Sequence, residues 1–214
     1  MTRGTSRSPG TVVLASRNAK KLAELRRVLQ PLLPRIEVLG LDEVDDYDEP
    51  AETESTFEGN ALIKARACWQ VSGLPSVADD SGICVDALNG MPGVLSARLS
   101  GKSDARSRAE TDAANNALLL AQLADVPDER RSAQFVCAVA LVGPDGTELV
   151  ERGTMPGRIL RAEQGEGGFG YDPLFVADGN SVSNAELLPE QKDAISHRGK
   201  ALRALVPHLR TLAT

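Results

Sequence analysis

The chain has 214 residues, 42% of them hydrophobic, and a formal net charge of -6. This length and composition are enough for one domain, or for two closely joined lobes, with a buried core. An acidic chain without clustered Lys and Arg argues against a nucleic-acid or anionic-membrane surface as the main partner. A local cationic pocket can still bind one phosphorylated small molecule.

The three cysteines are widely spaced and form no C-x-x-C pair, so they indicate neither a disulfide framework nor a zinc site. No apolar run approaches the length of a membrane span. The polar residues 1–10 predict a disordered N-terminal lead and not a signal peptide. We therefore expect a cytoplasmic protein with a single domain over residues 11–214.

After the lead, the chain predicts a strand, a loop, a helix and a second strand. Residues 11–15 are β-branched and apolar, and leucines then recur at helical spacing. Pro31 and Pro34 end this helix, and residues 36–39 predict the second strand.

An acidic stretch, residues 42–58, follows with nine acids and no base. Taken alone, such a stretch predicts a solvated loop. Ser55 lies three residues before Glu58, which is the spacing of a capping box, so we expect the next helix to begin there. Gly73 predicts the C-terminal cap of that helix.

Asp79 and Asp80 stand between two short runs that predict strands, residues 76–78 and 83–87. If the first run is a strand, its acids emerge at the carboxyl end, where open α/β sheets bind ligands, and Gly82 lets the backbone turn sharply. Adjacent side chains of an extended segment point to opposite sides, so one carboxylate can ligate Mg²⁺ while the other orients water. The alternative is a simple turn, because Asp, Ser and Gly favour turns.

Ser103 or Asp104 predicts the cap of a long alanine-rich helix. Residues 133–142 and 147–151 then alternate around a Gly-Pro-Asp-Gly turn at residues 143–146, which predicts an antiparallel hairpin. Together with the strand and helix units, the hairpin predicts an α/β fold. We expect a mixed twisted sheet flanked by helices, in two lobes with a central active-site cleft.

The turn after the first strand carries Ser16, Asn18 and Lys21 at the start of a helix. Unpaired helix N–H groups and the helix dipole make such a turn a natural anion site, and the lysine adds positive charge. The alternative is that Ser16 or Asn18 only caps the helix while the lysines are solvated. The chain has no G-x-x-x-x-G-K-[ST] motif, so the usual ATPase and GTPase loop is absent.

Residues 165–170 satisfy G-x-G-x-x-G, but they do not predict a dinucleotide-binding fold. That fold needs a helix after the glycines, whereas Pro173 disfavours helical geometry at Asp172. A loop with an aromatic ring, Phe169, and a carboxylate, Asp172, is better suited to hold a flat base by stacking and edge hydrogen bonds. Phe169 as a core anchor is the alternative.

Lys192, His197 and Arg198 place three cationic or switchable donors near the start of the last helix. This helix begins near Ser196, and Pro207 kinks or ends it. Such a cluster favours an anion or a carbonyl oxygen. The alternative is that His197 is a surface or capping residue and Arg198 a solvated charge.

Five motifs in this order together resemble the inosine-triphosphate pyrophosphatase family, and the chain is similar to its bacterial members from residue 11 to about residue 209. The motifs are Ser16-x-Asn18-x-x-Lys21, Thr56-Phe57-x-x-Asn60-Ala61, Ala78-Asp79-Asp80-Ser81-Gly82, Gly168-Phe169-Gly170-Tyr171-Asp172-Pro173 and Ser196-His197-Arg198-Gly199. The resemblance implies hydrolysis of noncanonical purine nucleoside triphosphates, such as ITP, dITP and XTP, to the monophosphate and pyrophosphate. It also implies Mg²⁺ as cofactor and a homodimer.

The same resemblance implies roles for single residues. Asp80 would be the catalytic base and a metal contact, with Asp79 beside it and Glu52 as a more distant metal ligand. Lys21 would neutralise charge near the scissile bond. The implied substrate-binding residues are Ser16, Arg17, Asn18, Ala19, Lys20, Lys21, Ser81, Phe169, Gly170, Tyr171, Asp172, Lys192, His197 and Arg198.

For the base, the resemblance implies that Phe169 stacks on the purine and that Asp172 bonds its edge. Lys192, His197 and Arg198 would meet the keto oxygens that distinguish hypoxanthine and xanthine.

One departure from the family pattern is Gly59, where the family commonly has Glu. A helix-interior Gly costs about 1 kcal/mol against Ala, so the departure concerns local stability more than chemistry. Two other classes of function stay open. A non-catalytic nucleotide sensor would share the phosphate cradle and the base loop without needing three carboxylates, and an acidic interaction module would bind no nucleotide.

Overall fold

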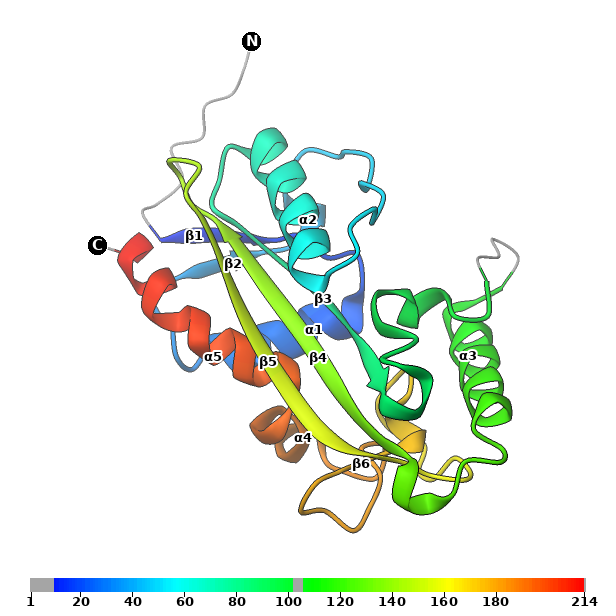
Figure 1. Cartoon of the computed structure of the whole chain (residues 1–214). Coiled ribbons are helices and arrows are strands. Elements are labelled where there is room, and N and C mark those ends of the chain that lie inside the picture. The colour runs from blue at the N-terminus through cyan, green and yellow to red at the C-terminus, as the bar shows by residue number, and fades with distance from the viewer. Residues whose placement is uncertain (1–9, 102–105, 214) are drawn as a thin grey trace. The chain divides into compact units, whose positions relative to one another are not determined.

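The computed structural model describes residues 10–101 and 106–213, where the chain forms strands of one sheet together with α-helices (Figure 1). The predicted N-terminal lead falls almost wholly on residues 1–9, outside the described part. The strands are β1 Thr11–Leu14, β2 Glu37–Leu39, β3 Ser76–Val85, β4 Ser132–Val142, β5 Glu148–Ile159 and β6 Phe175–Ala177. The helices are α1 Ala19–Leu29, α2 Phe57–Ser72, α3 Arg108–Gln122, α4 Pro189–Ile195 and α5 His197–Arg210.

The six-stranded sheet has the order β2-β1-β3-β4-β5-β6. Strand β1 pairs in parallel with β2 and with β3, whereas β5 and β6 are antiparallel. A five-residue connection joins the neighbouring strands β4 and β5, which only an antiparallel hairpin allows. The mixed sheet and the hairpin are therefore as predicted.

The chain divides into two compact units. The first comprises residues 1–80, 138–152 and 201–214, and the second comprises residues 81–137 and 153–200. The single domain with a central cleft stays a prediction.

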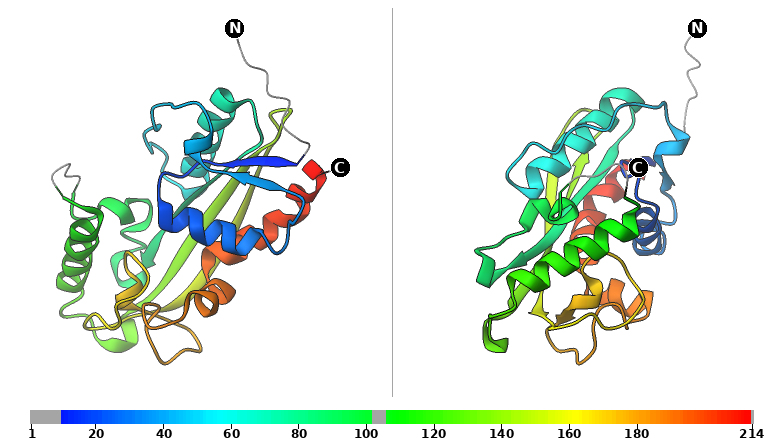
Figure 2. Two further views of the ribbon diagram at one scale, coloured as in Figure 1. Left: turned by 180° about the vertical axis from the view of Figure 1, so that it is seen from behind. Right: turned by 90° about the vertical axis from the view of Figure 1, so that its right-hand side faces the viewer.

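In the first unit, strand β1 is buried along its whole length, as a strand of a parallel sheet covered on both faces should be. Figure 2 shows β1 and β2 side by side with α1 close to them. Leu25 and Leu29 are the buried leucines of α1, and Asn18 caps the helix by accepting the N–H groups of Lys20 and Lys21. The leucine spacing thus predicted the buried face of this helix correctly.

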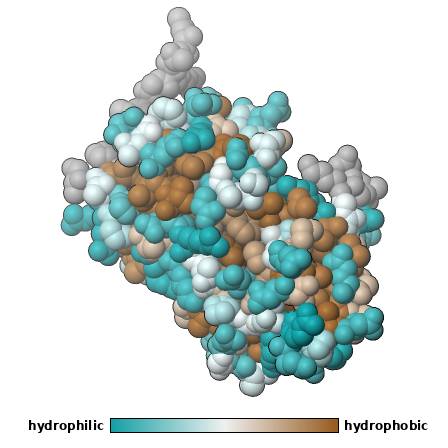
Figure 3. Space-filling model, in the orientation of Figure 1, coloured by the Kyte–Doolittle hydropathy of each residue, from teal (hydrophilic) through white to brown (hydrophobic). Residues whose placement is uncertain are grey.

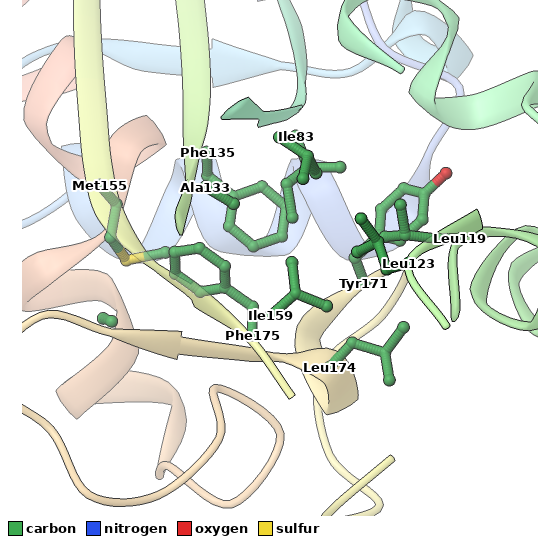
Figure 4. Close-up of a cluster of buried hydrophobic side chains, with 12 residues drawn as sticks. Ile83, Leu119, Leu123, Ala133, Phe135, Met155, Ile159, Tyr171, Leu174 and Phe175 are labelled. Atoms are coloured by element: carbon green, nitrogen blue, oxygen red, sulfur yellow. The ribbon is translucent and has the colours of Figure 1, made fainter. Parts of the chain in front are cut away.

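The core of the second unit is an apolar cluster that joins helix α3 to strands β3 to β6 (Figure 4). Phe135 and Phe175 meet edge to face, with ring centroids 4.8 Å apart, a geometry worth about 0.5–1.5 kcal/mol beyond the buried area. Tyr171 belongs to the same cluster and lies near Leu119 of α3 and near Leu123, the C-cap residue of that helix. The loop that ends at Tyr171 therefore packs against the core of the second unit through this side chain.

Strand β3 differs from the prediction. It is one continuous ten-residue strand, so Asp79 and Asp80 lie inside it and neither at a strand end nor in a turn. Gly82 makes no sharp turn. A Cβ at Gly82 would collide with Ser96 Oγ and with the carbonyl oxygen of Gly93, so this glycine is needed for close packing.

Two predicted helix caps were also wrong. Thr56 and not Ser55 caps α2, by accepting the N–H of Gly59, whereas Gly73 closes the helix in the left-handed conformation as expected. Ser107 caps α3 through a capping box with Glu110. Ser103 and Asp104, the predicted caps of that helix, lie outside the described residues. Both corrections are shifts within a polar segment that offers several capping residues.

The C-terminal region differs in two details. Helix α4 was not predicted, and Lys192 lies in it instead of in the last helix. Pro207 lies inside α5, which continues to Arg210.

Polar and apolar side chains are interspersed on the face shown in Figure 3. Within the described ranges, no helix combines the length and the apolar character that crossing a membrane requires.

Candidate active site

Strand β3 aims Asp79 and Asp80 at lysines of two different helices. Asp79 Oδ2 accepts a hydrogen bond from Lys21 Nζ of α1 at 2.9 Å, and Asp80 Oδ1 accepts one from Lys64 Nζ of α2 at 3.2 Å. The two directions follow from the alternation of side chains along a strand. The carboxylate side chains are 1% and 8% exposed, so the lysines supply the charge that buried carboxylates need.

Lys64 also pairs with Glu52, with Nζ to Oε1 at 3.0 Å. Glu52 lies in the part of the acidic stretch that precedes α2, which we call the acidic loop. The lysine is buried, and although burial opposes its charged form, the fields of Asp80, Asp79 and Glu52 raise its pKa. Burial also raises the pKa of Asp80, an effect that Lys64 opposes and Glu52 reinforces. Asp80 is therefore a stronger base than an exposed aspartate.

Asn60 connects the acidic loop to Asp80. Its Oδ1 accepts the N–H of Glu54 at 3.0 Å, and its Nδ2 donates to the carbonyl oxygen of Glu54 at 3.2 Å. The same amide nitrogen is 3.3 Å from Asp80 Oδ2. One fully buried side chain thus fixes the loop that carries Glu52 with respect to the carboxylate on β3.

The turn before α1 combines the two alternatives that its sequence left open. Asn18 is the helix cap, and Ser16 Oγ accepts the N–H of Asn18 at 3.3 Å. Lys21 faces Asp79, whereas Ala19 and Lys20 are exposed on the first turn. The turn therefore places a lysine and the positive end of a helix dipole next to each other, with Lys21 paired to Asp79.

Arg17 points toward the acidic loop. Its guanidinium donates to Asp46 Oδ1 at 3.0 Å and to the carbonyl oxygen of Tyr47 at 2.6 Å, and it lies 6.0 Å from the Tyr47 ring. Both side chains of the ion pair are well exposed, so it contributes little to stability.

The three carboxylates do not all face one point. Glu52 and Asp80 converge on one point, which the ammonium of Lys64 takes up, while Asp79 faces Lys21. Across residues 10–101 and 106–213, no group of three His, Cys, Asp or Glu side chains forms a metal cluster. Two converging carboxylates fit Mg²⁺, which is commonly held by one or two carboxylates together with substrate phosphates and water.

In the second unit, two cations lie against the ring of Phe169. Lys192 Nζ is 4.8 Å and Arg198 Cζ is 5.8 Å from the ring centroid, within cation–π range. Arg198 is 2% exposed and donates to Ser81 Oγ at 2.9 Å. The structure thus brings together the aromatic ring and two of the three donors that the sequence singled out for the base.

Asp172 organises the loop that carries Phe169, residues 165–171, which we call the glycine loop. It is 3% exposed and accepts the N–H of Phe169 at 2.8 Å and the ammonium of Lys192 at 2.5 Å. Asn184 Nδ2 lies 3.4 Å from its other oxygen. A hydrogen bond that a base donates to Asp172 would have to replace or share one of these contacts.

Three further residues complete the base region. His197 is 5% exposed and stacks on Phe135, with centroids 4.9 Å apart, so it is not the surface residue of the alternative reading. Tyr171 donates to the carbonyl oxygen of Ser96 at 2.8 Å, and burial raises its pKa. Gly170 precedes it in the left-handed conformation, with φ of 61°.

No role was predicted from the sequence for Lys64, Asn60 or Asn184. A signal for the first two was present, because Lys64 and Asn60 lie four residues apart on the otherwise apolar buried face of α2. Polar residues at such positions need partners, and the acids of the neighbouring segments supply them. Asn184 gave no comparable signal.

The mixed sheet, the capped turn that begins α1 and the lysine-paired carboxylates of β3 define an α/β protein. The chain belongs to the Ham1 family, whose family model matches residues 12–208. This confirms the resemblance drawn from the five motifs.

Relatives with known names are similar to this protein over nearly the whole chain. A dITP/XTP pyrophosphatase from Nocardia farcinica is 63% identical over 203 residues, covering 94% of this chain and 96% of the relative. The crystal structure of a nucleoside-triphosphatase, dITP/XTP pyrophosphatase, from Mycobacterium abscessus is 56% identical, with a TM-score of 0.73 over 92% of this chain and 99% of its own. The Ham1 protein of Staphylococcus aureus is 38% identical, with a TM-score of 0.80 over 94% and 98%.

Proposed function

We propose that this protein hydrolyses noncanonical purine nucleoside triphosphates, namely ITP, dITP and XTP, to the nucleoside monophosphate and pyrophosphate, with Mg²⁺ as cofactor. The observation that carries the proposal is the pair of neighbouring carboxylates on β3, each held by a lysine from a different helix. This arrangement supplies cations for a polyphosphate and a base for water. The names of the relatives, dITP/XTP pyrophosphatases, support the choice of substrate.

In the proposed reaction, attack of water on the α-phosphorus builds negative charge on the phosphate oxygens. Lys21 and the helix N-terminus behind it stabilise that charge, and Asp80 takes the proton from water. Glu52 and Asp80, whose carboxylates converge at Lys64, would hold Mg²⁺. When bound, Mg²⁺ withdraws charge from the phosphate oxygens.

The second unit selects the base. Phe169 offers a ring for stacking, and Lys192, His197 and Arg198 offer donors to the keto oxygens of hypoxanthine and xanthine. We further propose a cytoplasmic homodimer, which the resemblance to the family supports.

The test is a product assay with ITP and Mg²⁺ that separates pyrophosphate from orthophosphate. We expect IMP and pyrophosphate in equal amounts. If ITP and Mg²⁺ raise Tm but no product forms, the protein binds the nucleotide without hydrolysing it and is a nucleotide sensor. If ITP and Mg²⁺ do not change Tm and no product forms, the protein binds no nucleotide, as expected for an acidic interaction module.

A further inference from the structure

Helix α3 holds both backbone polar groups of Gly170. The N–H of Gly170 donates to Asp112 Oδ2 at 3.0 Å, and Asn116 Nδ2 donates to its carbonyl oxygen at 3.2 Å. Asp112 and Asn116 are four residues apart, so they lie on one face of α3. We call this pair the α3 clamp.

The α3 clamp is built of polar groups that are largely withdrawn from water. Asn116 is 3% exposed, and its amide nitrogen also donates to Glu163 Oε1 at 2.7 Å. The side chain of Asp112 is 20% exposed, and its bond to Gly170 is charge-assisted and hence the stronger one. Arg108 lies 3.7 Å from the other oxygen of Asp112.

The α3 clamp holds Gly170, the residue at which the backbone of the glycine loop turns. Gly170 has φ of 61°, a conformation that glycine shares almost equally with alternatives at negative φ. Two hydrogen bonds to fixed side chains select one of these conformations. The neighbouring residue Phe169 is thereby presented in one orientation, with its N–H on Asp172 and its ring over Lys192.

From this geometry we infer that Asp112 and Asn116 are positioning residues for base recognition, which act through Gly170 and touch no substrate. The inference rests on the proposed function. It predicts that loss of the clamp weakens binding of the purine ring, whereas binding of the triphosphate and the chemical step stay intact.

The kinetic test compares Asp112→Ala with Asp112→Asn, in which the amide oxygen can still accept the N–H of Gly170. We expect Asp112→Ala to raise KM for ITP about tenfold with kcat changed less than about twofold, because one charge-assisted hydrogen bond is lost. Asp112→Asn should recover most of the loss. Inhibition by inorganic tripolyphosphate, which has no base, should be equal in wild type and both variants. Asn116→Leu should raise KM by a smaller factor.

Two variants of α3 serve as controls. Asn115→Ala removes a neighbouring buried amide that holds the N–H of Ser100 and the carbonyl oxygen of Ser96. It should lower Tm as much as Asn116→Leu with less effect on KM. Arg108→Ala removes the other contact of Asp112 and should leave KM unchanged.

A readout without substrate is hydrogen exchange at the amide of Gly170, which should accelerate in Asp112→Ala and stay slow in Arg108→Ala. Faster exchange together with a raised KM supports the inference. Unchanged exchange, or an unchanged KM in an enzyme that hydrolyses ITP, overturns it. A wild-type protein that does not hydrolyse ITP overturns the proposed function and with it the role in base recognition, while the exchange result still tells whether the clamp exists.

Discussion

The acidic loop of the first unit and the glycine loop of the second are fixed in different ways. Residues of the acidic loop are held by the exposed guanidinium of Arg17 and by the buried amide of Asn60. In the glycine loop, by contrast, hydrogen bonds hold three consecutive residues, Phe169, Gly170 and Tyr171. Its contacts also reach the apolar core through Tyr171.

This difference suits two tasks. The acidic loop brings the carboxylate of Glu52 to Lys64, beside Asp80, which is where we propose that Mg²⁺ binds. For the base selection that we propose, the groups of the glycine loop need to be in place beforehand, because the two bases differ in the direction of their hydrogen bonds. We therefore expect substitutions in the first unit to change rate and metal dependence, and those in the second to change the choice of base.

The largest effect is expected for Asp80→Asn. This variant removes the base and a metal ligand with little change in shape, and loss of a general base alone lowers kcat by roughly 10²–10⁴-fold. Affinity for ITP, measured by calorimetry, should be largely kept. A loss of less than about tenfold at saturating Mg²⁺ would show that Asp80 is not the base.

Lys64→Met tests the charge balance of the first unit. It leaves the buried Asp80 without its cation, and we expect a loss of about 2–3 kcal/mol in the free energy of unfolding at neutral pH, below the roughly 3–5 kcal/mol of fully buried pairs because Glu52 is partly exposed. The loss should shrink as the pH falls toward the raised pKa of Asp80, since protonation removes the uncompensated charge. Urea unfolding at several pH values measures it, and a loss independent of pH would point to packing alone.

Glu52→Gln tests whether the acidic loop of the first unit binds Mg²⁺. If Glu52 is a ligand, the Mg²⁺ concentration for half-maximal rate should rise several-fold, because a carboxylate is exchanged for a neutral amide. Glu54→Gln is the matched control, since Glu54 lies in the same loop and uses its backbone in the contacts with Asn60. Identical Mg²⁺ titrations for wild type and Glu52→Gln would show that Glu52 is not a metal ligand and that the acidic stretch is only a solvated loop.

The smallest effect concerns Gly59. It is the third residue of α2, where an added Cβ would approach the Cβ of Glu54 to 2.6 Å. Gly59→Ala should therefore gain much less than the roughly 1 kcal/mol expected at an open helix position. A gain of the full amount in urea unfolding would show that Glu54 moves aside freely.

The sequence predicted the elements with strong periodicity, including β1, α1, α2 and the hairpin of β4 and β5. It failed at β3, where Asp79 and Asp80 favour a turn by propensity. Lysines from two helices neutralise these acids and let the strand continue. Such compensation comes from segments distant in the chain, which local patterns do not report.

At the candidate site, short motifs supplied the residue types but few of the partners. Asp172 was expected at the edge of a base, and the structure shows it holding Phe169 and Lys192. No role was predicted for Lys64, because its partners Glu52 and Asp80 come from other segments of the chain.

The base selection that we propose for the donors and acceptors of the second unit is tested most directly by kcat/KM of the wild type for ITP, XTP, GTP and ATP at fixed Mg²⁺. Adenine reverses both edge groups of hypoxanthine, and two unsatisfied groups at about 1–3 kcal/mol each predict a preference for ITP over ATP on the order of 30-fold to 10⁴-fold. GTP shares the keto oxygen and N1–H, so it should lie well below ITP and XTP and at or above ATP. Equal efficiency for ATP and ITP would contradict selection at the base edge and indicate a general nucleotide pyrophosphatase.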